Sequence, residues 1–264
     1  MSEVSNLRAA CVEAARRGGA VLRAKWGQQR TIEFKGGTDL VTDADRASEA
    51  AVLGFLHAEF PDAAVLAEES GASGGPPGGL HFYVDPLDGT TNYAHGVPQF
   101  AVTIGASDRS GLAAGATYDP LRDEMFTAGR GEGATLGETR IHHSGRAELR
   151  GSLLVTGFPY DMHERGELPL RLFGAFMLRS RGVRRFGAAA IDLAWVACGR
   201  LDGFWELTLK PWDVAAGIVI AREAGALVTD LEGGEAMLES GEVLVAPPEL
   251  HVRMREIVRA ELGR

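Results

Sequence analysis

Apolar and polar positions alternate through the N-terminal part of the chain with the three- to four-residue spacing of one helix face. The apolar positions of the first such stretch are Leu7, Cys11, Ala14, Gly18 and Leu22. They predict an amphipathic helix over residues 6–26. A second periodic stretch predicts a helix over residues 43–60, which Pro61 ends because proline cannot continue the backbone hydrogen bonding.

Short apolar runs replace the helical spacing from residue 63 and predict strands. The runs cover residues 63–67, 80–85, 99–107, 111–119 and 124–137, the last of which closes a series of hairpins. Between the first two runs, residues 71–79 have the sequence GASGGPPGG. This composition predicts a mobile loop without a fixed path.

Strands and helices alternate in the C-terminal part of the chain. The expected strands are 152–157, 202–206, 226–229 and 243–246, and the expected helices are 168–179, 188–198, 213–224 and 248–262. Such alternation is typical of an α/β protein. We expect one domain over residues 1–264, with loosely separated halves at 1–150 and 151–264.

Composition narrows the class of protein further. The 264 residues are 45% hydrophobic, and 36 Asp and Glu against 27 Lys and Arg give a net charge of −9. This hydrophobic content excludes a disordered chain, and two cysteines exclude a disulfide framework. The acidic balance argues against a broad nucleic-acid surface, which needs basic side chains opposite phosphates. A local group of arginines is the exception: Arg179, Arg181, Arg184 and Arg185.

Location follows from two further features of the sequence. No apolar run approaches the roughly 20 residues that a bilayer crossing needs. The N-terminal residues also lack the apolar stretch of a signal peptide. We therefore expect a cytoplasmic protein.

The most informative motif is Asp85-Pro86-Leu87-Asp88-Gly89-Thr90, at the end of an apolar strand. If the chain turns there, the two carboxylates can converge on one point, with the spacing of metal ligands. Mg²⁺ prefers such oxygen ligands, and the backbone N–H groups after Asp88 could hold a phosphate. An ordinary Asp-rich β-turn is the alternative interpretation of the motif taken alone.

Further acids lie at the ends of other predicted elements. Glu68 and Glu69 follow an apolar strand, and Asp213 follows Trp212 at the start of a helix, where it could also serve as an N-cap. In α/β proteins ligands bind at the carboxyl ends of strands. Acids at several such ends therefore favour a binding site over unrelated surface charges. The tryptophans Trp195, Trp205 and Trp212 are interpreted as packing residues.

Two long segments resemble the signatures of the inositol monophosphatase family. They are VDPLDGTTNYAHGVPQFAVTIG, starting at Val84, and KPWDVAAGIVIAREAGALVTD, starting at Lys210. Residues 35–45, 67–70 and 184–206 also match, in the family's order. The chain is identified as a member, similar to the bacterial inositol-1-monophosphatase type. The resemblance implies a layered α-β-α-β-α sandwich of the sugar-phosphatase type and a homodimer.

The resemblance also implies roles for individual residues. Glu68, Asp85 and the Leu87 carbonyl would hold a first Mg²⁺, and Asp85, Asp88 and Asp213 a second. A third, weaker ion would bind near Glu68. Thr90, paired with Asp45 and helped by Glu68, would deprotonate the attacking water. The residues that would contact substrate are Asp88, Gly89, Thr90, Gly187, Ala188, Ala189, Glu206 and Asp213.

The implied activity is Mg²⁺-dependent hydrolysis of inositol monophosphate, or of a related polyol or sugar phosphate, to the alcohol and inorganic phosphate. Ala188 replaces a threonine of the animal enzymes, so strict inositol selectivity is in question. Histidinol phosphate, fructose 1,6-bisphosphate or a nucleotide 3′-phosphate are alternative substrates. A binding role with RNA or the transcription machinery, through the arginines 179–185, is an alternative of another class. Inhibition by Li⁺ is expected from the resemblance.

Overall fold

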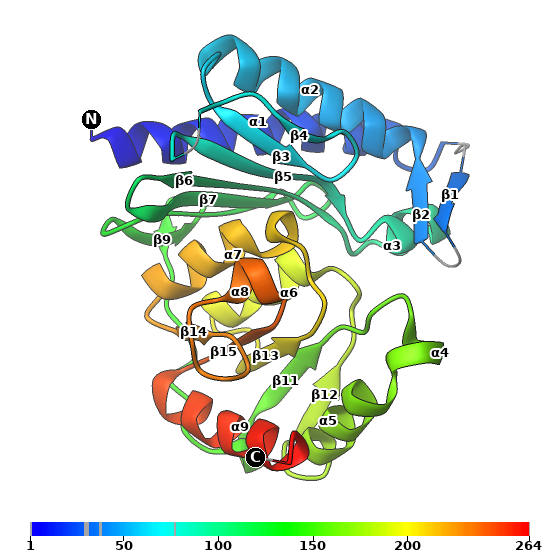
Figure 1. Cartoon of the computed structure of the whole chain (residues 1–264), viewed down its shortest axis with the longest axis vertical. Coiled ribbons are helices and arrows are strands. Elements are labelled where there is room, and N and C mark those ends of the chain that lie inside the picture. The colour runs from blue at the N-terminus through cyan, green and yellow to red at the C-terminus, as the bar shows by residue number, and fades with distance from the viewer. Residues whose placement is uncertain (1, 29–31, 37–38, 77, 264) are drawn as a thin grey trace.

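The computed structural model describes residues 2–28, 32–36, 39–76 and 78–263, and it stacks them in five layers (Figure 1). The outer layer consists of α1 (Glu3–Lys25) and α2 (Asp43–Glu59). An eight-stranded sheet separates these helices from α6 (Ala189–Ala197) and α7 (Pro211–Glu223). A five-stranded sheet follows, and α5 (Glu167–Met177) and α9 (Pro248–Glu261) close the stack. The predicted α-β-α-β-α sandwich is confirmed.

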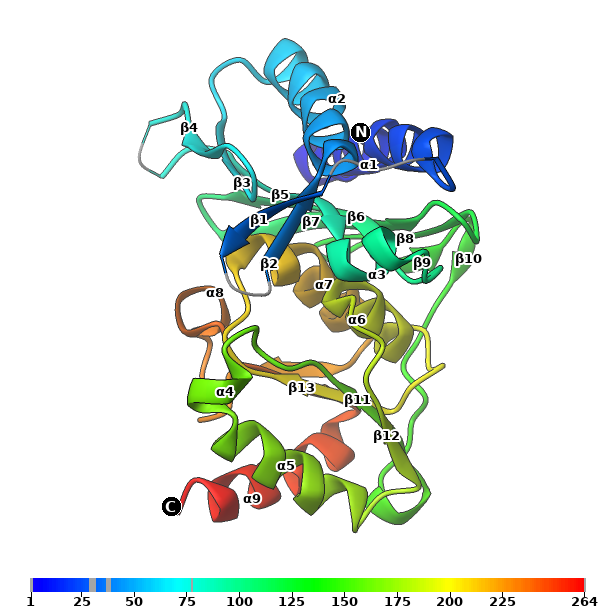
Figure 2. The same ribbon diagram turned by 90° about the vertical axis from the view of Figure 1, so that its right-hand side faces the viewer.

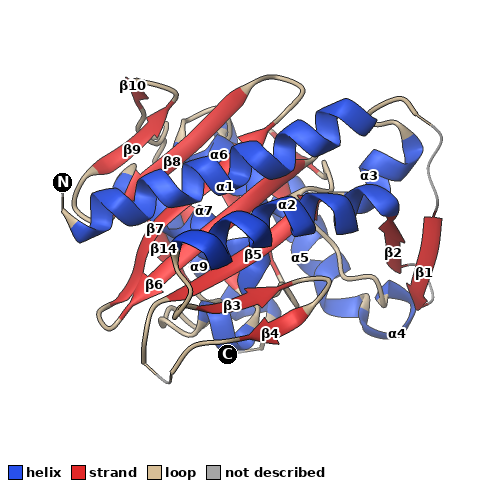
Figure 3. Cartoon of the chain, turned by 90° about the horizontal axis from the view of Figure 1, so that it is seen from above, coloured by secondary structure: helices blue, strands red, loops and turns tan. Residues whose placement is uncertain are grey.

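The larger sheet has the strand order β10-β9-β8-β7-β6-β5-β3-β4. Its strands are β3 (Ala64–Ala67), β4 (Gly71–Ser73), β5 (His81–Asp88), β6 (Ala101–Asp108), β7 (Gly111–Asp119), β8 (Glu124–Gly129), β9 (Gly133–Leu136) and β10 (Thr139–Arg140). Only β3 and β5 run parallel; the other neighbours are antiparallel. Seen from above, α1 and α2 lie over this sheet (Figure 3). On its other face α7 approaches so closely that a Cβ on Gly105 would lie 2.6 Å from that of Ala215.

The smaller sheet has the order β12-β11-β13-β15-β14. Its strands are β11 (Leu153–Thr156), β12 (Gly182–Arg184), β13 (Gly203–Glu206), β14 (Leu227–Thr229) and β15 (Val243–Ala246). Strand β11 runs parallel to β12 and β13, whereas β15 runs antiparallel to β13 and β14. The three parallel strands end at the same edge, where ligands of α/β sheets bind.

Three larger apolar cores hold the layers together, and a small fourth cluster of Ala101, Ala188 and Ile191 completes those found among the described residues. One lies between α1, α2 and the larger sheet and includes Leu22, Val52 and Phe82. The second joins both sheets to α6 and α7. The third lies under α5 and α9 and includes the buried Trp205. None of the helices in the described ranges has the length and apolar character needed to cross a bilayer.

Several short elements were absent from the sequence prediction. They are the hairpin β1 (Ile32–Gly36) and β2 (Asp39–Thr42), the helices α3 (Thr90–His95), α4 (Met162–Arg165) and α8 (Met237–Ser240), the 3₁₀ turn Leu149–Gly151, and the strands β10 and β12. The hairpin stands beside α3 at one side of the molecule (Figure 2). Such elements are too short to show a hydrophobic period.

The predicted loop 71–79 is partly a strand. Its first three residues form β4, which pairs antiparallel with β3. The prediction of a segment without a fixed path is therefore wrong for residues 71–73. The backbone hydrogen bonds to β3 hold it in spite of its composition. Pro77 lies outside the described residues.

Candidate active site

Strand β5 carries the Asp-Pro-Leu-Asp motif, and a β-bulge brings both carboxylates to one side. Two residues three positions apart point to opposite faces of a regular strand. Here Asp85 pairs with Thr103 and Asp88 with Ala101, so three steps along β5 match two steps along β6. The extra residue turns Asp88 to the face of Asp85. The expected turn after Asp85 is thus a bulge within a strand that continues to Asp88.

Helices α2, α6 and α7 begin near this strand end, and at the start of each an aspartate accepts a hydrogen bond from the backbone. Asp45 in α2 accepts from the Thr42 backbone N–H at 2.9 Å. Asp213 in α7 accepts from the Lys210 N–H at 2.7 Å. Asp213 is therefore the third residue of α7 and not its N-cap.

Asp88 belongs to β5, but it accepts the first backbone N–H groups of α6. Its Oδ1 accepts from the Ala189 N–H at 3.2 Å, and its Oδ2 from the Ala190 N–H at 2.8 Å. Helix N-termini carry partial positive charge, so their convergence favours anions at this place.

Thr90 stands at the start of α3 and connects two of these elements. Its hydroxyl lies 2.9 Å from Asp45 Oδ1 and 3.1 Å from the Leu87 carbonyl oxygen. The preceding Gly89 has φ +93°, a conformation that side chains rarely adopt. A Cβ there would lie 3.0 Å from the Gln99 carbonyl oxygen. Glycine therefore permits the close turn between Asp88 and Thr90.

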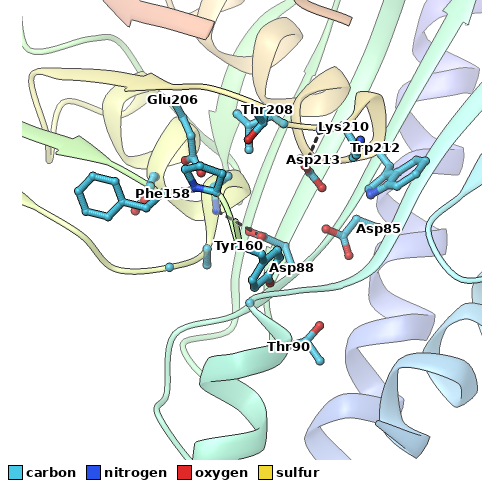
Figure 4. A pocket seen from close by; sticks show the side chains of 18 of the residues that line it. Asp85, Asp88, Thr90, Phe158, Tyr160, Glu206, Thr208, Lys210, Trp212 and Asp213 are labelled. Atoms are coloured by element: carbon cyan, nitrogen blue, oxygen red, sulfur yellow. Dashed lines mark hydrogen bonds between the residues drawn. The ribbon is translucent and has the colours of Figure 1, made fainter. Parts of the chain in front are cut away.

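These residues surround one cavity of about 310 Å³ (Figure 4). The expected metal, phosphate and substrate residues that line it are Glu68, Asp85, Leu87, Asp88, Gly89, Thr90, Gly187, Ala188, Ala189, Glu206 and Asp213. Asp45 does not line the cavity and lies buried behind Thr90. The structure thus brings all the candidate residues together, with Asp45 one hydrogen bond away.

Burial and mutual repulsion dominate the electrostatics of this cavity. Burial raises the pKa of Asp85 well above its usual value, and the carboxylates of Glu68, Asp88 and Asp213 raise it further. Burial also raises the pKa of Asp88 to about 6, although hydrogen bonds from the backbone N–H groups of α6 lower it. The pKa of Glu206 rises to about 8 because of burial and then of Asp213 and Asp88. Such a cluster of acids calls for a positive ligand.

The donor set fits Mg²⁺, which takes carboxylate and carbonyl oxygens. Asp85, Asp88 and Asp213 are each anchored by backbone N–H groups, and the Leu87 carbonyl lies beside them. As they stand, no three acidic, histidine or cysteine side chains of the described residues are close enough to bind one ion.

Sequence reasoning missed part of the lining. The missed residues are Gly157, Phe158, Pro159, Tyr160, Arg185, Asp192, Leu207, Thr208, Leu209, Lys210 and Trp212. Trp212 faces the cavity, so its interpretation as a packing residue is wrong, because α7 begins at Pro211 and turns its first residues toward the site. Asp192 had a usable signal: it follows Ala188 and Ala189 by one helical turn and so shares their face.

Comparison with known proteins gives a consistent result. The model of the family described as "Inositol monophosphatase family" matches residues 3–262. A curated relative from Haemophilus influenzae, named Nus factor SuhB, is 39% identical over 96% of this chain and 95% of its own.

Two solved structures are also similar to this chain over nearly its whole length. The extragenic suppressor protein SuhB from Bartonella henselae superimposes with a TM-score of 0.92 at 38% identity, over 96% of this chain and 98% of that one. An inositol monophosphatase from Anabaena has a TM-score of 0.89 at 38% identity, over 98% and 97% of the two chains.

Proposed function

This chain belongs to the inositol monophosphatase family, and we propose that it is a Mg²⁺-dependent phosphomonoesterase acting on inositol monophosphate or a related polyol or sugar phosphate. The observation that supports this proposal most directly is the bulge in β5, which aims Asp85 and Asp88 into a cavity that the first residues of α6 and α7 also line. Carboxylates and N–H groups in one cavity suit a metal and a phosphate together.

In this proposal Glu68, Asp85, the Leu87 carbonyl, Asp88 and Asp213 would hold two to three Mg²⁺ ions. When bound, they supply a more acidic water and neutralise charge on the phosphate and the leaving alkoxide. The protein's own part is to fix these ligands. Backbone N–H groups hold Asp85, Asp88 and Asp213 before the metal arrives, so less order has to be gained on binding.

Thr90 and Asp45 form the proton-handling pair. The Thr90 hydroxyl donates to Asp45, so its lone pairs remain able to accept a hydrogen bond from the attacking water, and Asp45 is the base that takes the proton. Glu68 lines the same cavity and assists as a base. The N–H groups of Gly89 and Thr90 hold the phosphate oxygens while the water displaces the alcohol in line. The water oxygen bonds to phosphorus as the ester P–O bond breaks. One proton of the water passes through Thr90 to Asp45, and the leaving alkoxide takes up one proton from solvent, so the net products are the alcohol and inorganic phosphate.

The alcohol would be bound by Glu206 together with the start of α6. Carboxylates accept hydrogen bonds from the hydroxyls of a polyol. Ala188 is buried and contributes no hydroxyl, so selectivity among polyols would be relaxed. Histidinol phosphate, fructose 1,6-bisphosphate and nucleotide 3′-phosphates are the alternative substrates to compare with inositol monophosphate.

A substrate panel tests this function. Phosphate release is measured with Mg²⁺ for inositol 1-phosphate and for those three alternatives, and kcat/KM is compared. We expect inositol 1-phosphate or a sugar phosphate to give the highest value. Asp88→Asn should abolish activity on every substrate, and unchanged activity of that variant would contradict the proposal.

A binding role in transcription is the second candidate. It is favoured by the name Nus factor carried by relatives at 37–39% identity. It is also favoured by the exposure of all four arginines at 179, 181, 184 and 185, on or near the edge strand β12. Retention of RNA or transcription proteins in a pull-down should fall when Arg179, Arg181 and Arg184 are changed to Glu. If the variant retains them as well as the wild type does, the arginines have no such binding role.

Three further expectations belong to the same proposal: a cytoplasmic location, a homodimer and inhibition by Li⁺. Cell fractionation, light scattering and inhibition assays test them one by one.

A further inference from the structure

One side of the cavity holds polar groups that the phosphate chemistry does not use. In Figure 4, Glu206 and Phe158 lie on the side away from Asp85 and Trp212. Glu206 ends β13, and it lies so close to Gly157 that a Cβ on Gly157 would collide with its carboxylate. Asp192 and Arg185 line the same cavity. The substrate's alcohol would occupy this side.

Asp192 is the least explained of these groups. It is 1% exposed and is the fourth residue of α6, one helical turn after Ala188 and Ala189. Its Oδ1 has no hydrogen-bond partner among the residues that the structure describes. A buried carboxylate oxygen without a partner is costly, so a group of this kind points to a ligand that supplies one.

Arg185 gives this side a hydrogen-bond donor. Its Nη1 lies 2.6 Å from where a Cβ of Gly187 would be, so the guanidinium lies against the glycine backbone. Its charge lowers the pKa of both Asp192 and Glu206, which burial raises. Two acceptor carboxylates and one donor guanidinium can each engage a hydroxyl, because a hydroxyl both donates and accepts.

We infer that Asp192 is a specificity-determining residue whose carboxylate accepts a hydrogen bond from a hydroxyl of the substrate's alcohol, beside the hydroxyl bound by Glu206. The inference rests on the proposed function. It assigns the site to phosphate esters that carry at least two free hydroxyls near the ester. Esters of alcohols without further hydroxyls would gain nothing from Asp192.

The test compares inositol 1-phosphate with p-nitrophenyl phosphate, which has no other hydroxyl. Asp192→Ala should lower kcat/KM for inositol 1-phosphate by about 10- to 100-fold, the usual effect of losing a charged hydrogen bond. It should leave kcat/KM for p-nitrophenyl phosphate within about threefold. Asp192→Asn, which keeps an acceptor oxygen, should give a smaller loss.

Asp202→Asn is the matched control. Asp202 is also buried, but its carboxylate accepts from the Leu153 N–H at 2.7 Å, so its loss should affect stability and not the ratio of the two substrates. Binding of myo-inositol measured by calorimetry, without turnover, should weaken in Asp192→Ala only.

If Asp192→Ala leaves the ratio of the two kcat/KM values unchanged, whether by equal losses or by no loss, the proposed role of Asp192 is overturned. A wild-type protein that cleaves neither ester would overturn the proposed function itself.

Discussion

Replacing Thr90 by valine removes one hydroxyl and keeps the shape of the side chain. The hydroxyl is shared between Asp45 Oδ1 at 2.9 Å and the Leu87 carbonyl at 3.1 Å. Positioned proton transfer contributes about 10²- to 10⁴-fold, so kcat should fall by that factor, or about 3–5 kcal/mol of barrier. Phosphate release from the best substrate at saturating Mg²⁺ measures the change.

The same substitution has a smaller effect on folding. Asp45 keeps its bond from the Thr42 N–H, and only Oδ1 loses its partner. Loss of one buried hydrogen bond costs about 1–2 kcal/mol, which corresponds to a fall in Tm of roughly 2–8 °C for a chain of this size. Thr90→Ser is the matched control and should keep kcat within about tenfold.

The pairing of the two residues can be tested by a double mutant. If Thr90 and Asp45 act as one unit, Thr90→Val combined with Asp45→Asn should be little worse than either change alone. A valine variant with kcat within threefold of the wild type would refute the assignment of the water-orienting hydroxyl.

Three further outcomes follow from single features of the structure. Gly89→Ala forces a side chain into φ +93° and within 3.0 Å of the Gln99 carbonyl, so it should lower urea stability by about 1–3 kcal/mol and reduce kcat. Burial lowers the pKa of His251 to about 4, below its unfolded value, so stability is lost as pH falls from about 6.5 toward 4. Urea midpoints at pH 7 and pH 5 should differ less in His251→Gln. The raised pKa values of Asp88, about 6, and Glu206, about 8, mean that the metal-free protein loses stability as pH rises through them. Mg²⁺ should therefore raise Tm more at pH 8 than at pH 5, and an equal rise at both would count against the acid cluster as its site.

The helices and strands of most layers and the acidic motif could be predicted from the sequence, because each is one continuous segment, whereas the layered architecture was implied by the resemblance to the family. The bulge could not: a regular strand would place Asp85 and Asp88 on opposite faces, and only the pairing of β5 with β6 reveals the extra residue. The hydrogen bonds from α6 to Asp88 join residues more than a hundred positions apart. Such contacts have no local signal.

Asp192 was missed for a different reason. It is an isolated acid in a helix that is otherwise apolar and buried, so its neighbours favoured a packing role for the whole segment. A helical wheel starting from Ala188 places it toward the site. Strands β5 and β13 and helices α6 and α7, which line the cavity, were predicted, but the distances between them depend on the packing of both sheets against α6 and α7.

The central claim is that the carboxylates of this cavity hold the metal needed for phosphate-ester hydrolysis. Phosphate release from inositol 1-phosphate by the wild-type protein, first in EDTA and then across a Mg²⁺ titration, tests it most directly. We predict no release above background in EDTA and a saturable rise with Mg²⁺. Release at the same rate in EDTA, or none at any Mg²⁺ concentration, would contradict the account.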